Sequence, residues 1–87
     1  MTASYRVLVK KSAEGELRSL PKKDLRRVME RIRALAGDAR PSGCEKLSGQ
    51  DRYRVRQDDY PMVYAIDDEH HIVEIVKVGH RREVYRG

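Results

Sequence analysis

The sequence predicts a single small α+β domain over residues 1–87, in which an antiparallel sheet packs one face against a helical pair. Three observations lead to this class. A helical apolar stripe marks the N-terminal half, three short strand-like segments fill the C-terminal half, and short polar turns separate them. With 87 residues, such a domain has marginal stability unless a partner binds it.

The expected order of elements is β-α-α-β-β-β. Residues 5–10 alternate in polarity and predict a first strand, and Ser12 is expected to cap a short helix that ends near Ser19. Pro21 favours the first turn of a second helix, which Gly37 is expected to end. The apolar stripe of that second helix comprises Leu25, Val28, Met29, Ile32, Leu35 and Ala36.

The C-terminal half contains the other three predicted strands. Residues 38–51 include proline, glycine and serine, and indicate a loop. Residues 52–57 alternate arginine with less polar side chains, which is typical of a half-buried strand. Residues 60–67 are apolar on both faces, as an inner strand requires, and residues 72–78 are rich in β-branched side chains. The intervening Asp67–His71 segment is expected to turn.

Composition indicates a basic protein, whose charge suits a polyanion partner but is shared by many soluble proteins. Lysine and arginine total 19 against 14 acidic residues, a net charge of +5. The single cysteine, Cys44, excludes an internal disulfide and a cysteine-rich zinc site. The start of the chain does not look like a signal peptide, and no apolar run approaches the roughly 20 residues that span a bilayer. We therefore expect a cytoplasmic protein without a membrane partner.

Three arginines of the second predicted strand form the first candidate site. The two-residue period of a strand places Arg52, Arg54 and Arg56 on one face, with Tyr53 and Val55 turned toward the core. Three like charges repel each other unless an anion lies among them, and the planar guanidinium matches phosphate oxygens. The alternative interpretation is a merely solvated strand face.

The basic C-terminal segment forms the second candidate site. Gly79 ends the last strand and allows the chain to turn, so that the segment can return toward the arginine strand. His80 can exchange protons near neutral pH. Tyr85 can stack on a base or accept a proton, and Arg81 can join the phosphate site. The alternative interpretation is a basic disordered tail.

Together these groups suit RNA cleavage by attack of the ribose 2′-hydroxyl on its own phosphodiester. Because that nucleophile belongs to the substrate, no catalytic serine, cysteine, metal ion or other cofactor is needed. Clustered arginines stabilise the charge that develops on the phosphorane. The basic face of the second helix is either simply solvated or contacts ribosomal RNA or another polyanion through Lys22, Lys23 and Arg26.

Other motifs are weak. The adjacent His70 and His71 lie in an acidic turn, which favours a solvated turn over a metal site. Cys44 has no evident activating partner, and Asp58 with Asp59 suits a hairpin turn. The chain has no phosphate-binding loop motif.

Several segments resemble one known family. Residues 53–56 (YRVR), 60–66 (YPMVYAI) and 76–85 (VKVGHRREVY) resemble the RelE branch of the RelE/ParE toxin superfamily. Residues 45–49 (EKLSG) resemble the segment that precedes the second strand of that family. Since the order of elements also matches, the resemblance covers nearly the whole chain.

The resemblance implies the toxin of a type II toxin–antitoxin system, a ribosome-dependent mRNA endoribonuclease. It implies a RelB-like protein antitoxin, through which operator DNA is contacted only indirectly. By position, Arg54 and Arg56 match basic residues that act on the scissile phosphate or in proton transfer. Arg81 matches a phosphate-stabilising arginine, Tyr85 a tyrosine that stacks on the substrate or assists its activation, and Lys46 a basic position near the RNA path.

Two departures from the family pattern bear on the site. Pro61 stands where many members have arginine, so one phosphate contact is either missing or made by Arg52 or Arg82. Pro61 itself is expected at a strand start or bulge. Second, Arg54 and Arg56 stand where the best-known member of the family has lysines. Since guanidinium groups do not release protons, proton transfer then falls to His80 or Tyr85.

Two other functions remain open. A ParE-like inhibitor of DNA gyrase has the same fold, and fold does not settle function. Such an inhibitor needs no proton-transfer groups, so His80 and Tyr85 would be dispensable. A toxin homologue with weak or no catalysis, acting as a binding module, is the other alternative, and Pro61 is the feature that favours it.

Overall fold

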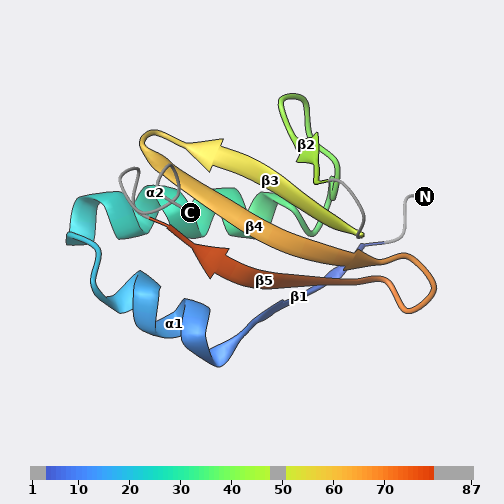
Figure 1. The fold of residues 1–87 in the computed structure, drawn as a ribbon, viewed down its shortest axis with the longest axis horizontal. Coiled ribbons are helices and arrows are strands. Elements are labelled where there is room, and N and C mark those ends of the chain that lie inside the picture. The colour runs from blue at the N-terminus through green and yellow to red at the C-terminus, as the bar shows by residue number, and fades with distance from the viewer. Residues whose placement is uncertain (1–3, 48–50, 80–87) are drawn as a thin grey trace.

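Two helices and five strands make up the described part of the chain (Figure 1). The computed structural model describes residues 4–47 and 51–79. The elements in chain order are β1 (Arg6–Val9), α1 (Lys11–Arg18), α2 (Lys22–Ala34), β2 (Glu45–Lys46), β3 (Arg52–Gln57), β4 (Tyr60–Asp67) and β5 (Ile72–Val78). The predicted α+β class is confirmed, with the extra strand β2.

The five strands form one sheet in the order β1-β5-β4-β3-β2. Hairpin connections make β3, β4 and β5 antiparallel, as expected. However, β1 pairs in parallel with β5, with Val7 opposite Val73, so the sheet is mixed and not wholly antiparallel. No hairpin joins β1 to β5, because both helices and three strands intervene, and their relative direction is therefore not set by a short turn.

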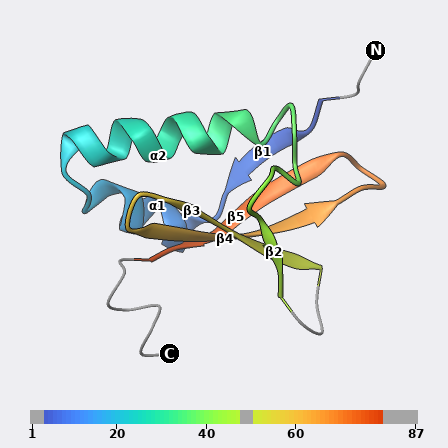
Figure 2. The ribbon, with the colours of Figure 1, turned by 90° about the horizontal axis from the view of Figure 1, so that it is seen from above.

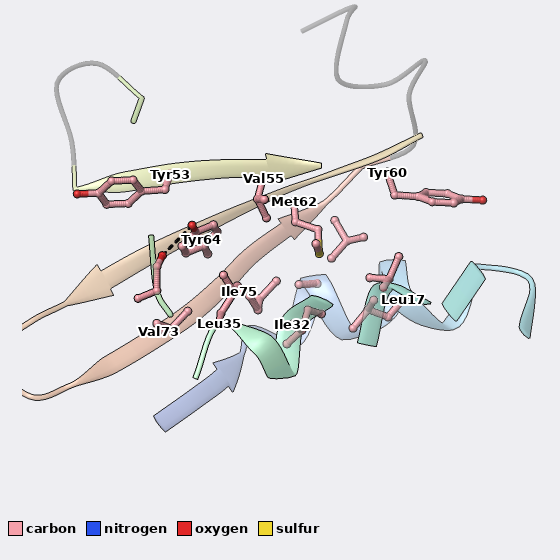
Figure 3. Packing of buried hydrophobic residues seen from close by; sticks show 14 of the residues in the cluster. Leu17, Ile32, Leu35, Tyr53, Val55, Tyr60, Met62, Tyr64, Val73 and Ile75 are labelled. Atoms are coloured by element: carbon pink, nitrogen blue, oxygen red, sulfur yellow. Dashed lines mark hydrogen bonds between the residues drawn. The ribbon is translucent and has the colours of Figure 1, made fainter. Parts of the chain in front are cut away.

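Both helices lie on the same side of the sheet (Figure 2). Tyr64, Met62 and Ile75 project from the sheet toward α1 and α2 and are completely buried, at 0% exposure (Figure 3). Of the predicted stripe, Val28 and Ile32 of α2 and Leu35 just after it are buried, while Leu25, Met29 and Ala36 are partly buried. α1 adds Ala13 and Leu17. The helical period therefore identified the packed face of α2 correctly.

The helix ends differ in detail from expectation. The expected cap, Ser12, lies inside α1, and Lys10 occupies the capping position without a side-chain hydrogen bond. The helix starts earlier because β1 leads directly into it, and the Glu14 amide donates to the Lys10 carbonyl at 2.9 Å. Pro21 precedes α2 at its N-cap, and that helix ends at Ala34, ahead of Gly37.

The short strand β2 lies in the segment that the sequence indicates as a loop. Glu45 lies opposite Arg54 and Lys46 lies opposite Tyr53. The Leu47 amide then donates to the Arg52 carbonyl at 2.8 Å. Two residues are too few to show an alternating pattern, so sequence periodicity could not reveal this strand.

A polar cluster fixes the end of the sheet near the turn between β4 and β5. Arg40 donates to both carboxylate oxygens of Asp68, at 3.2 and 2.8 Å, and through Nε to the Tyr53 hydroxyl at 3.2 Å. The Tyr5 hydroxyl also donates to Asp68, at 2.6 Å. These contacts hold the pKa of Asp68 down, at about 2, chiefly through Arg40 and then Tyr5. The cluster ties the segment after α2 to the sheet.

The buried Tyr64 hydroxyl reinforces that connection by donating to the Ala39 carbonyl at 2.9 Å. Burial raises the pKa of Tyr64, so the hydroxyl keeps its proton.

Neither α1 nor α2 has the length and apolar character needed to cross a bilayer.

Candidate functional site

The arginines of β3 lie on the sheet face that is opposite the helices. Burial alternates along this strand as expected, with Tyr53 and Val55 only 8% and 2% exposed. Arg52, Arg54 and Arg56 lie on the other side, and alternate residues of a strand are about 7 Å apart. Three arginines therefore follow one line along β3, on the sheet face that neither of the described helices covers (Figure 2).

Arg54, at the centre of this line, is held by a carboxylate of β2. Its Nη2 donates to Glu45 Oε1 at 2.9 Å. The side chain of Arg54 is 29% exposed, whereas that of Glu45 is 64% exposed. Glu45 was not among the predicted site residues, since its face became definable only once the pairing of β2 with β3 was known.

A β-bulge adds a fourth cation to the same face. Along β4, Val63 lies opposite Lys77 but the next residue, Tyr64, lies opposite Ile75, so Val76 is the extra residue of β5. A bulge of this kind shifts the facing of all residues beyond it by one position. As a result Lys77, which is exposed, lies on the side of the sheet that carries the arginines.

Residues that lie opposite one another form a row across the four strands β2, β3, β4 and β5. Glu45 lies opposite Arg54, Arg54 lies opposite Val63, and Val63 lies opposite Lys77. Directly opposite residues share a sheet face. We call the surface formed by Arg52, Arg54, Arg56 and Lys77 the arginine face.

The root of the C-terminal segment lies beside this face. The Gly79 amide donates to the Pro61 carbonyl at 2.9 Å, and Pro61 pairs with Arg56 in the register. The Val78 amide donates to the Glu16 carboxylate of α1 at 2.9 Å. Two hydrogen bonds therefore fix where the chain leaves β5. The predicted residues His80, Arg81, Arg82 and Tyr85 lie outside the described residues.

Pro61 is the second residue of β4, near the strand start where it was expected. A two-residue turn, Asp58–Asp59, connects β3 to β4. The pair that closes such a turn, Gln57 with Tyr60, exchanges hydrogen bonds, and the next pair does not. The ladder between β3 and β4 therefore needs no N–H donor at Pro61, and the missing hydrogen of its ring nitrogen costs this ladder no hydrogen bond.

Four other predicted RNA-binding residues lie away from the arginine face. Lys22, Lys23 and Arg26 are exposed on α2, on the far side of the sheet. Lys46 pairs with Tyr53, so the register assigns it to the helix side. The basic residues thus form two surfaces, one on the helix side and one on the arginine face.

The structure adds little support for the weaker candidate site residues. Asp67, Glu69 and His70 have potential ligand atoms within 4.8 Å of one another, but all three are exposed. Asp67 and His70 bond to each other at 2.8 Å, which holds the pKa of Asp67 below its ordinary value. Asp58 and Asp59 lie in the turn between β3 and β4, as expected, and Cys44 is half-buried.

Chemically, the arginine face suits a phosphodiester backbone. Each guanidinium offers several donors in a plane, and the row of β3 presents them along one line. The exposed Lys77 extends the positive charge across the sheet. The described residues of this face include no imidazole, so proton transfer there requires a group from elsewhere or from the substrate.

Comparisons with known proteins identify the family of this chain. The family model described as the ParE toxin of type II toxin–antitoxin systems, parDE, matches residues 7–85. Toxin RelE of Mycobacterium tuberculosis is 50% identical over 34 residues, which are 39% of this chain and 35% of that protein. That match therefore spans only about a third of the relative.

Solved structures match over most of the chain. RelE in the archaeal RelE–RelB complex from Pyrococcus horikoshii OT3 is 32% identical with a TM-score of 0.81, covering 90% of this chain and 96% of that one. The toxin–antitoxin complex RelBE2 from Mycobacterium tuberculosis gives 30% identity and a TM-score of 0.80, covering 90% and 99%. The chain therefore belongs to the RelE/ParE toxin superfamily and is a RelE-like toxin of a type II toxin–antitoxin system.

Proposed function

We propose that this toxin is an endoribonuclease that cuts mRNA held on the ribosome. The observation that carries the proposal is the arginine row of β3, which faces away from the helices beside the root of the C-terminal segment. A single-stranded RNA backbone laid along this row meets cations at a spacing of about 7 Å. Membership of the RelE branch supports the same activity.

The reaction is an internal transesterification. The ribose 2′-oxygen forms a bond to the adjacent phosphorus as the bond from phosphorus to the 5′-oxygen breaks, which leaves a cyclic phosphate and a 5′-hydroxyl. Arg54, Arg56 and Arg81 neutralise the charge on the phosphorane. His80 and Tyr85 accept the 2′-hydroxyl proton and return one to the leaving oxygen. This route needs no metal ion or cofactor, because the substrate carries its own nucleophile.

The remaining cations extend the RNA path. Arg52, Arg82 and Lys77 hold phosphates next to the scissile one, and Lys46 contacts RNA from the helix side of the edge strand β2. The exposed Lys22, Lys23 and Arg26 of α2 contact ribosomal RNA from the other side of the sheet. One molecule therefore bridges mRNA and the ribosome, which is how cleavage comes to depend on translation.

The proposed protein partner is a RelB-like antitoxin. Two structural relatives were solved as RelE–RelB or RelBE complexes. An acidic segment that orders itself on the basic surfaces of this toxin would silence it and stabilise its fold. Operator DNA is contacted only through that antitoxin, and no membrane is involved. A target on translating ribosomes makes the cytoplasm the proposed site of action.

Mapping of mRNA 5′ ends after induction tests the proposal. Expression without antitoxin should stop growth and produce new 5′ ends within translated reading frames. The Arg81→Ala and Arg54→Ala variants should produce neither effect at equal protein levels. Growth arrest with intact mRNA would reject the proposed activity.

The alternative with an observation in its favour is inhibition of DNA gyrase. The family model that matches the chain is that of the ParE toxin. This activity predicts induced DNA-damage signalling, and it predicts that His80→Ala and Tyr85→Ala variants remain toxic. A catalytically weak binding module, which Pro61 favours, predicts no growth arrest at all.

A further inference from the structure

The contact between Glu45 and Arg54 places a carboxylate inside the candidate phosphate site. β2 is only two residues long and pairs with the middle of β3, so that Glu45 lies directly opposite Arg54. The carboxylate oxygen is 2.9 Å from Nη2. A protein oxygen therefore occupies a position at the guanidinium that a phosphate oxygen of RNA would take.

The ion pair between Glu45 and Arg54 can break at little cost in stability. The Glu45 side chain is 64% exposed and belongs to the edge strand of the sheet. Solvent-exposed ion pairs contribute little to stability, since water and salt screen them. The Arg54 side chain, at 29% exposed, is covered more and stays near the row of β3. When the contact breaks, the carboxylate can turn into solvent while Arg54 remains in place.

We propose that Glu45 is an internal competitor of the RNA phosphate at Arg54, which lowers the affinity of this toxin for free RNA. The inference rests on the proposed function, because it takes RNA as the ligand of the arginine face. A free strand must displace the carboxylate with the few contacts it makes. On the ribosome, the cations of α2 contact ribosomal RNA and hold the toxin against the mRNA strand, which then displaces the carboxylate readily.

This competition offers a physical reason for ribosome dependence. The cations of the arginine face attract single-stranded RNA of any sequence through counterion release. A carboxylate at the central arginine weakens that indiscriminate binding at the position where the scissile phosphate sits. It also keeps the Arg54 guanidinium oriented across the sheet before the substrate arrives.

The test is the isosteric substitution Glu45→Gln in the full-length purified toxin. The probe is a short single-stranded RNA with 2′-O-methyl riboses, which cannot be cut. Removal of the competing charge should raise its affinity about two- to fivefold at low salt.

Glu74→Gln is the matched control. Glu74 is exposed on the same side of the sheet but lies in β5, opposite Ala65 and two strands from Arg54. This variant changes the net charge by the same amount and should leave RNA affinity within about twofold of the wild type. In an Arg54→Ala background, Glu45→Gln should have no further effect on affinity, because the competition requires both partners.

The outcomes separate the two proposals. If the wild-type toxin cuts ribosome-held mRNA but both glutamine variants bind RNA like the wild type, the competitor role is wrong and the proposed function stands. Equal gains for both glutamine variants would show a general charge effect, which also overturns the competitor role. A hundredfold loss of cleavage with unchanged affinity would instead assign Glu45 to the chemistry. If the wild type neither binds nor cuts RNA, the proposed function itself fails.

Discussion

Arg40 and Arg54 each bind a carboxylate, but they do so in very different surroundings. Arg40 donates to both oxygens of Asp68 and to the Tyr53 hydroxyl, and its guanidinium lies 5.1 Å from the centre of the Tyr53 ring. Arg54 bonds through Nη2 to the exposed carboxylate of Glu45 on an edge strand. The planar guanidinium of Arg40 thus holds separate segments of the protein together.

The difference indicates which arginine is structural and which can take a ligand. Arg40 itself follows α2, and its two partners come from β3 and from the turn after β4, so the cluster joins three parts of the chain. The Arg54 partner comes from the adjacent strand alone. We therefore expect substitutions in the two regions to separate stability from activity.

The largest expected effect is that of Arg54→Ala on cleavage. Loss of a cation that stabilises the phosphorane should slow cleavage of ribosome-held mRNA by about a hundredfold or more. The melting temperature should change by no more than about 2 °C, since an exposed ion pair contributes little. Arg18→Ala is the matched control, because Arg18 is a cation at the end of α1 with an 80% exposed side chain.

Arg40→Ala should show the reverse pattern. Its removal leaves Asp68 and the Tyr53 hydroxyl without their shared donor, so the melting temperature should fall by about 5 °C. Cleavage measured well below the melting temperature should stay within about threefold of the wild type. Thermal unfolding and a cleavage assay on the same sample check both halves. Lost cleavage without lost stability would abolish the distinction between the two regions.

The Lys77→Ala variant tests whether the RNA-binding surface extends from β3 to β5. If the bulge in β5 brings this lysine into the RNA path, affinity for single-stranded RNA should fall about threefold, and the salt dependence should become shallower by about 0.7. Lys11→Ala, at the exposed start of α1, removes the same charge on another surface. Equal losses for the two variants would mean that only net charge matters.

The smallest expected effect is the acid sensitivity of the Arg40 region. The pKa of Asp68 is about 2 in the folded state, lowered from an ordinary value of 3.8. A lowered pKa stabilises the fold above pH 4, and this contribution disappears as the pH falls from about 4 to about 2. Asp68→Asn should therefore melt lower than the wild type at pH 7, and the difference should shrink toward pH 2. A constant difference across this range would contradict the assignment.

The sequence was sufficient to predict the elements that have a long hydrophobic pattern. The stripe of α2 and the alternation of β3 both follow from side-chain periodicity, and the structure agrees with each. The direction of β1 was not predictable, because β1 meets β5 only after the whole intervening chain has folded. Propensity and period are local properties, whereas strand pairing is not.

The candidate site was predictable only in part, for the same reason. The facing of Arg52, Arg54 and Arg56 depends on one strand, and it was predicted correctly. Glu45 and Lys77 depend on a two-residue strand and on a bulge, and no sequence pattern announces either. The places of His80 and Tyr85 stay predictions, anchored by the position of Gly79 beside Pro61.

The most direct test of the arginine face is a single-turnover reaction on mRNA bound to purified ribosomes. The wild-type toxin should cut this mRNA and leave a 5′-hydroxyl end, Arg40→Ala should cut it at a similar rate, and Arg54→Ala should leave it intact. Equal cleavage by Arg54→Ala and the wild type would contradict the role assigned to this face.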